Sequence, residues 1–139
     1  MGGRSDPPVP AVVVSPARDR PFEEHVRAGA AIARAAERSD RRIALIASAD
    51  HGHGHEASGP YGYHAESKVY DDRVVEIVKS NSLERLLEFE PSFIDDAKAD
   101  SYWQMLMLHG ALGDAWDVDF LSYEAPTYFG MLCAAYAAM

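Results

Sequence analysis

The sequence predicts an α/β fold in which a parallel-rich sheet lies between helices on both faces, a three-layer αβα arrangement. Two short apolar runs, residues 11–15 and 43–47, flank a stretch whose small and apolar residues recur at helical spacing. Continuous apolar runs are typical of strands that helices cover on both faces. A strand–helix–strand unit of this length takes a right-handed crossover, so we expect the two strands to be parallel.

Length and composition indicate one domain with a core of its own. The chain has 139 residues, 47% of them hydrophobic, and a net charge of −9 that argues against a nucleic-acid partner. Cys133 is the only cysteine, and the chain begins without a recognisable signal peptide, so we expect a cytoplasmic protein. The longest apolar stretch, residues 128–139, is shorter than the ~20 residues that span a bilayer, so no membrane partner is expected.

The first half of the chain is predicted to hold the strand–helix–strand unit. Residues 1–10 form a loose lead-in, and residues 11–139 form a single α/β domain. Pro21 suits the first turn of a helix over residues 22–38. The face that carries Gly29 is made of small residues, which predicts close packing on the sheet. The strand at 43–47 then leads into a loop rich in histidine.

The second half is predicted to be mostly helical. Asp71 or Asp72 can cap a helix, short helices follow at 83–87 and 91–94, and a strongly apolar helix covers 101–112. Residues 118–123 are predicted to form a third strand. Residues 128–138 are apolar all round, which predicts a buried final helix and a buried, inert Cys133.

The histidine loop follows directly after the second predicted strand. His51, His53 and His55 alternate with glycines. In an open α/β sheet, ligands bind beyond the carboxyl ends of the strands, which favours this loop as a site. The spacing leaves three interpretations open: a metal site on the three imidazoles, one acid/base histidine, or a solvated loop without a chemical role.

Four segments together resemble the catalytic subunit of class III (LigB-type) extradiol ring-cleavage dioxygenases. These are residues 46–63, 70–80, 100–114 and 120–136. The resemblance covers the chain from about residue 10 onward and corresponds to the C-terminal part of that subunit. It implies a LigB-like fold and, in the complete protein, oxidative opening of a catechol-type aromatic ring by O₂.

The resemblance also implies site residues. The family motif Ala-Ser-Gly-Asp-x-x-His matches residues 47–53, with alanine in place of the glycine, which makes His53 the acid/base histidine. Asp50 would orient the loop, and Tyr61 and Tyr63 would wall the aromatic substrate. Asp100, at the head of the helix ending in Gly-Ala-Leu, corresponds to the acidic ligand of a non-haem Fe(II), or is only a helix cap.

Two further iron-ligand histidines of the family have no counterpart here. His25 is the only histidine before residue 43. We therefore expect a partial metal site, in a fragment or in a natural short protein, that a homo-oligomer, a second chain or another segment completes. Two alternatives stay open: a non-catalytic LigB-fold homologue, and a zinc-dependent hydrolase that uses His51, His53 and His55.

Overall fold

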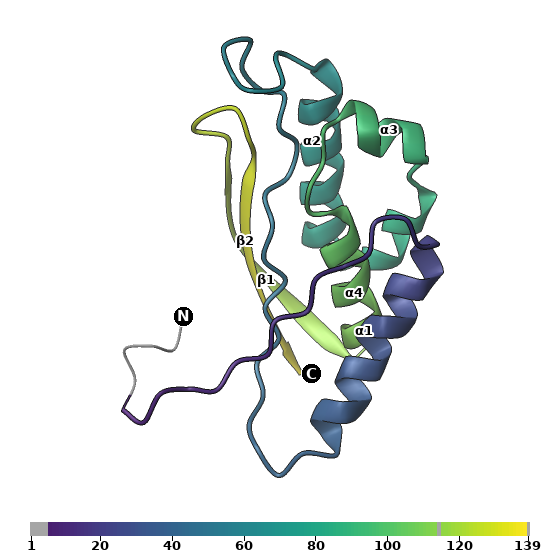
Figure 1. Cartoon of the computed structure of the whole chain (residues 1–139), viewed down its shortest axis with the longest axis vertical. Helices are drawn as coiled ribbons and strands as arrows, with labels where there is room; N and C mark the ends of the chain where they lie inside the picture. Colours follow the sequence, from purple (N-terminus) through teal and green to yellow (C-terminus); the bar gives the residue numbers. More distant parts are fainter. Residues whose placement is uncertain (1–5, 114, 139) are drawn as a thin grey trace.

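The computed structural model describes residues 6–113 and 115–138 (Figure 1). In chain order the elements are α1 (Phe22–Glu37), α2 (Ala65–Lys79), the 3₁₀ helix η1 (Leu83–Glu88), α3 (Pro91–Asp96), α4 (Tyr102–Leu112), β1 (Trp116–Glu124) and β2 (Met131–Ala138). The mixed α/β class is therefore confirmed. No helix in the described part of the chain is both long and apolar enough to cross a membrane.

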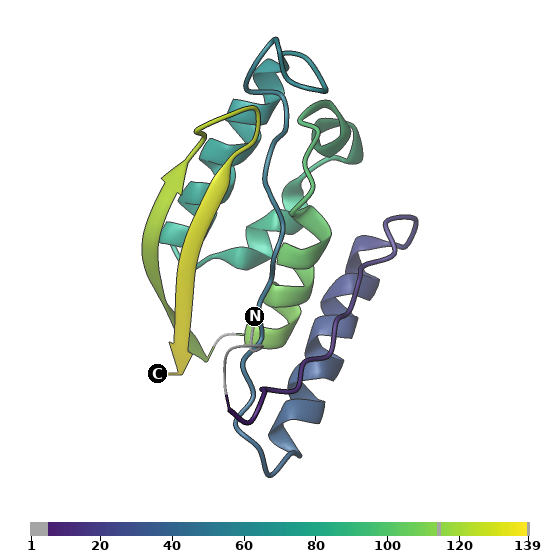
Figure 2. The ribbon, with the colours of Figure 1, turned by 60° about the vertical axis from the view of Figure 1, so that its left-hand side comes forward.

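Helices α2, α3 and α4 lie between a β-hairpin on one side and α1 on the other. β1 and β2 form the hairpin, α2 packs against β1, and α4 packs against α1 (Figures 1 and 2). The segment from residue 43 to residue 55 leaves the end of α1 and runs between the hairpin and the helices in both views. This path brings the histidine loop to the N-terminal end of α2.

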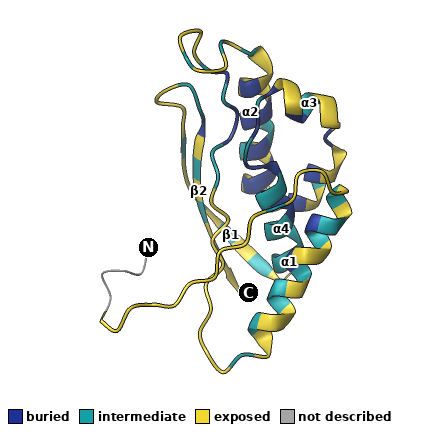
Figure 3. Cartoon of the chain, in the orientation of Figure 1, coloured by how far each residue is buried: buried dark blue, intermediate teal, exposed yellow. Residues whose placement is uncertain are grey.

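The core forms where α2, η1, α3 and α4 meet. Its largest fully buried side chains include Tyr70 and Ile77 of α2, Leu86 of η1 and Tyr102 of α4. The Tyr102 hydroxyl donates a hydrogen bond of 2.8 Å to the Leu86 carbonyl, which satisfies a polar group inside this apolar cluster. Figure 3 shows the buried residues concentrated on α2 and the neighbouring helices.

Two glycines allow α1 and α4 to cross closely. A Cβ at Gly29 would overlap the backbone carbonyl of Met107, and a Cβ at Gly110 would overlap that of Val26. The small-residue face of α1 is therefore used for close packing, as predicted, but its neighbour is helix α4. The prediction that it packs on a sheet was wrong, because the sheet lies on the other side of the helical layer.

The hairpin replaces the predicted final helix. β2 pairs antiparallel with β1, from Trp116 opposite Ala138 to Glu124 opposite Met131. Alternate residues of β2 are exposed, so Cys133 is exposed and the prediction that it is buried was wrong. An apolar run cannot distinguish a helix from a strand by composition, and here pairing with β1 decided the conformation. The third predicted strand is confirmed as β1.

The parallel sheet of the predicted three-layer fold is not found among the described residues. Their sheet has two antiparallel strands. Residues 11–15 and 43–47 are not strands here, and none of them makes a backbone hydrogen bond to another described residue. Val12 and Val13 are 91% and 89% exposed, so the apolar pattern is present without a paired neighbour. A strand needs such a neighbour to satisfy its backbone groups.

Candidate functional site

The glycines of the histidine loop let the loop lie directly against α2. A Cβ at Gly52 would come within 2.8 Å of Ser67 Cα, and one at Gly54 within 2.6 Å of His64 Cβ. The backbone N–H of Gly54 also donates to the Ser67 hydroxyl at 2.8 Å. A larger residue at either position would push the loop away from the helix, so these glycines fix its place.

The three histidines of the loop have three different partners. Nδ1 of His51 lies 2.7 Å from the Ser101 hydroxyl, at the start of α4. His53 approaches the backbone carbonyl of Lys98, and His55 approaches the carboxylate of Asp71. The loop therefore presents three separately anchored imidazoles, of which His53 lines a cavity.

The contact with Lys98 selects one tautomer of His53. The Lys98 carbonyl oxygen lies 3.0 Å from Nδ1 and accepts only, so Nδ1 carries the proton. In the neutral ring, Nε2 then holds the lone pair that takes up a proton. Lys98 has a positive φ of 51°, a backbone conformation uncommon outside glycine, at the turn between α3 and α4.

Aromatic rings and one carboxylate surround His53. The ring centroids of Tyr61, Tyr128 and Phe129 lie 5.6, 5.9 and 5.7 Å from that of His53. The Asp50 carboxylate lies 3.8 Å from His53 Nε2, beyond a direct hydrogen bond. The Asp50 carboxylate therefore lies on the side of His53 that carries the unprotonated nitrogen of the neutral ring.

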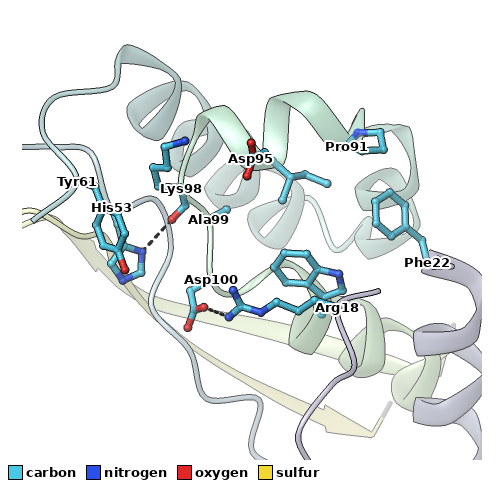
Figure 4. Close-up of a pocket in the computed structure, with 11 residues that line it drawn as sticks. Arg18, Phe22, His53, Tyr61, Pro91, Asp95, Lys98, Ala99 and Asp100 are labelled. Carbon is cyan, nitrogen blue, oxygen red and sulfur yellow. Dashed lines mark hydrogen bonds and ion pairs between the residues drawn. The ribbon is translucent and has the colours of Figure 1, made fainter. Parts of the chain in front are cut away.

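His53 and Asp100 line the same cavity of about 320 Å³ (Figure 4). Tyr61 and Trp103 contribute aromatic surface, and Arg18 contributes a positive charge. The remaining lining residues are Phe22, Pro91, Ile94, Asp95, Lys98 and Ala99. The volume and the mixture of aromatic and polar groups are suited to one small ring-containing molecule.

Asp100 forms an ion pair with Arg18 inside this cavity (Figure 4). The guanidinium of Arg18 also lies 4.6 Å from the centre of the Trp103 ring, in a cation–π contact. The backbone N–H of Asp100 donates to the His51 carbonyl at 3.3 Å. Asp100 precedes Ser101, the residue at the N-cap of α4, and makes no side-chain cap there.

The described residues do not form a complete metal site. No group of three or more His, Cys, Asp or Glu side chains among them is close enough together to hold an ion. The separate partners of His51, His53 and His55 account for this, because their rings are held apart. Asp100 offers one carboxylate, and its Oδ1 is paired with Arg18.

The structure brings together most of the predicted site residues. His53, Tyr61 and Asp100 line the cavity, and Asp50 lies beside His53. Tyr63 is 64% exposed and is not among the lining residues.

Several groups around the site were not predicted. Arg18, Trp103, Tyr128 and Phe129 are far from the histidine loop along the chain, so the sequence does not show that they lie near it. The role of Asp71 as the partner of His55 was missed for the same reason. His25 is buried near the start of α1.

Burial changes the titration of two groups near the loop. Desolvation lowers the pKa of His51 below its ordinary 6.5, and this outweighs the opposing effect of Asp71 and Asp50. Burial, and then the hydrogen bond to Asp71, raises the pKa of Tyr123. Both groups therefore stay neutral around pH 7: His51 is a fixed hydrogen-bonding group, and Tyr123 is a donor.

Comparison with known families gives a match that covers most of the chain. The family model described as the catalytic LigB subunit of aromatic ring-opening dioxygenase matches residues 3–132. That range includes the histidine loop, all the cavity-lining residues and most of the hairpin. No individually curated protein matched the sequence.

Proposed function

Because the chain belongs to the family of catalytic LigB subunits of aromatic ring-opening dioxygenases, we propose that it takes part in opening a catechol-type ring with O₂. His53 is the acid/base residue in this proposal. Asp50 supports the charge of His53, and Tyr61 walls the aromatic substrate. Tyr63 lies outside the cavity lining, so its contact with the substrate stays a prediction.

The observation that carries the proposal is the environment of His53. Its Nδ1–H is engaged by the Lys98 carbonyl, so Nε2 is the nitrogen with a free lone pair. The ring lines a cavity that also holds Asp100 and Tyr61. A base with a fixed tautomer, next to space for one aromatic ring, meets the geometric requirement of general acid–base catalysis.

His53 would move a proton in two directions during the reaction. Nε2 would accept the proton of a catechol hydroxyl, which increases the electron density of the ring, and the bound Fe(II) would supply the reactivity toward O₂. The resulting imidazolium lies 3.8 Å from the Asp50 carboxylate, which stabilises its charge. The same nitrogen then returns the proton to an oxygen atom as the O–O bond breaks.

The cofactor in this proposal is a non-haem Fe(II), which is typical of the family. Asp100 would supply one ligand after release from Arg18. The described residues do not supply the rest of a ligand set. We propose that a second chain, another copy of this chain or another segment brings the remaining ligands to the cavity.

The test begins with the purified chain under anaerobic conditions. Ferrous ion and catechol are added, and metal content is measured after desalting. Catechol binding is followed by the fluorescence of Trp103 in a Trp116→Phe background, since the chain has two tryptophans. We expect weak iron retention and measurable catechol binding by the chain alone. Ring opening is measured as O₂ uptake, and we expect it only when the missing metal ligands are present.

His53→Ala is the decisive variant for the acid/base role. We expect it to lower the rate of ring opening by about 100-fold or more, the usual contribution of a positioned acid/base group. His109→Ala is the matched control, because His109 lies in α4 outside the cavity lining. Equal rates for the two variants would remove His53 from the mechanism.

The same measurements separate the two alternatives. Iron binding without any O₂ uptake in the completed assembly would favour a non-catalytic homologue. Tight zinc binding by the chain alone, lost in His51→Ala, His53→Ala and His55→Ala, would favour the zinc hydrolase. The separate anchoring of these three side chains gives the hydrolase no support at present.

A further inference from the structure

The centre of α2 contains a fully buried carboxylate that the proposed chemistry does not use. The Asp71 side chain is 0% exposed, although it carries an ionisable group. The sequence pattern gave it a role only as a possible helix cap, but α2 begins six residues earlier, at Ala65. Burying a carboxylate is costly unless hydrogen bonds replace its water, so its partners indicate what holds it there.

Three donors converge on Asp71 from two other segments. Oδ1 accepts the backbone N–H of Gly52 at 2.8 Å. Oδ2 accepts Nε2–H of His55 at 2.8 Å and the hydroxyl of Tyr123 at 2.6 Å. One side chain therefore ties the histidine loop at two points and connects it to β1.

A β-bulge in β1 places Tyr123 beside Asp71. The register of the hairpin shifts between Phe120 and Ser122, with Leu121 as the extra residue. Trp116, Val118 and Phe120 alternate inward, and without the shift Ser122 would take the next inward place. The bulge changes the phase, so Tyr123 turns inward and reaches Asp71.

The segment before β2 also closes on the same carboxylate. A Cβ at Gly130 would overlap Oδ2 of Asp71, so only glycine fits there. Gly130 exchanges backbone hydrogen bonds with the loop, accepting from His51 at 2.9 Å and donating to Gly52 at 3.1 Å. Helix α2, the histidine loop and the hairpin thus meet at Asp71.

His53 lies between the two loop residues that Asp71 holds. Gly52 precedes it and His55 follows two residues later. Ser67, one turn before Asp71 on α2, holds Gly54 at 2.8 Å. We propose that Asp71 is a positioning residue that fixes residues 52–55 so that His53 keeps its ring in the cavity. The proposal rests on the proposed function, because it treats His53 as the reacting group.

Asp71→Asn is the direct test, since it keeps the volume and removes the charge. The amide group cannot accept from all three donors at once, so at least one anchor of the loop is lost. Asp72→Asn is the matched control: Asp72 is the exposed neighbour of Asp71, and its carboxylate pairs with Lys68. Both variants are compared with the unaltered chain by NMR, in the absence of metal.

We expect Asp71→Asn to make the amides of Gly52 and Gly54 exchange with solvent about tenfold faster or more, which corresponds to loss of a charge-assisted hydrogen bond. The ring resonances of His53 should also shift. Amides in α1 should be unaffected, and Asp72→Asn should leave the loop unchanged. Uniform acceleration along the whole chain, or none at the two glycines, would overturn the positioning role.

Tyr123→Phe gives a second test if Asp71→Asn fails to fold. It removes one donor and leaves the carboxylate with Gly52 and His55. Smaller changes in the same two glycine amides are expected, and their absence would count against Asp71 as the centre of the anchor.

Kinetics in the completed assembly separate positioning from simple stabilisation. Asp71→Asn should lower kcat while KM for catechol changes by no more than about twofold, because the cavity lining stays in place. An unchanged kcat in a variant with a loosened loop would overturn the link to His53. If the unaltered assembly opens no ring, the proposed function fails, and the NMR comparison still decides whether Asp71 holds the loop.

Discussion

The histidines of the histidine loop differ in burial and in side-chain partners, and their spacing in the sequence does not show this. The glycine spacing of His51, His53 and His55 does not distinguish them. In the structure His51 is buried against Ser101, His53 lines a cavity and His55 binds a buried carboxylate. The intervening glycines, which suggest a floppy loop, instead permit contact with α2. Side-chain partners, more than residue type, therefore separate the acid/base candidate from its neighbours.

His51 gives a prediction about stability and pH. Its folded-state pKa lies below the ordinary 6.5, so the unfolded chain takes up a proton at this residue before the folded chain does. Protonation of His51 therefore does not change the free energy of unfolding well above pH 6.5. As pH drops below that value, the free energy of unfolding falls. His51→Asn, which keeps a nitrogen near Ser101, should weaken this fall.

Urea unfolding at about pH 8 and about pH 5.5 measures the difference. His109→Asn, outside the loop, is the control and should leave the pH dependence closer to that of the unaltered chain. The same loss of stability on acidification in His51→Asn and in the unaltered chain would contradict the burial argument.

Whole elements show where periodicity succeeds and where it fails. Helical spacing correctly predicted α1, because three to four residues per turn leave a recognisable apolar pattern, while α4 was predicted from its apolar composition. It failed for β2, since a run of small apolar residues fits either conformation. The close crossing of α1 and α4 depends on Gly29 and Gly110, whose absent side chains let the two backbones touch.

The helix crossing gives a prediction that opposes helix propensity. Gly29→Ala improves propensity but places a Cβ on the Met107 carbonyl, so we expect it to destabilise the fold by about 1–3 kcal/mol. Ala28→Gly, at the exposed neighbouring position, should cost about 1 kcal/mol through propensity. Urea unfolding of both variants checks this, and a more stable Gly29→Ala would show that the helices do not cross as described.

At the scale of the whole molecule, apolar surface is distributed unevenly. The core lies among the helices, while the apolar residues of 11–15 and 43–47 remain exposed (Figure 3). Ile43 and Ile46 are 55% and 59% exposed on a segment that runs past the hairpin. The molecule thus combines a well-packed helical part with extended segments that lack strand pairing among the described residues.

This contrast predicts the pattern of hydrogen exchange in the isolated chain. Amides of residues 43–47 should exchange rapidly, because they donate to no described backbone carbonyl. Amides inside α2 and α4 should exchange slowly, since they are hydrogen-bonded within helices that pack on the core. Mass spectrometry of peptic fragments measures both, and strong protection of residues 43–47 would mean that they are paired in solution.

The sequence by itself predicted the mixed α/β class, helices over 22–38 and 101–112 and a strand over 118–123, which the structure places at 22–37, 102–112 and 116–124. These features depend on residue types and on spacing between residues that are close together in the sequence. It also gave the family resemblance, which the family match confirms.

Only the tertiary structure decided which groups meet. Asp71 and Tyr123 are separated by 52 positions, and His53 and Lys98 by 45, so no local pattern couples them. Strand pairing likewise depends on a partner elsewhere in the chain, which is why β2 formed where a helix was predicted and residues 43–47 stayed unpaired. Contacts between distant segments are set by packing and hydrogen bonding of the whole fold, and these selected His53 for the cavity and Asp71 for its support.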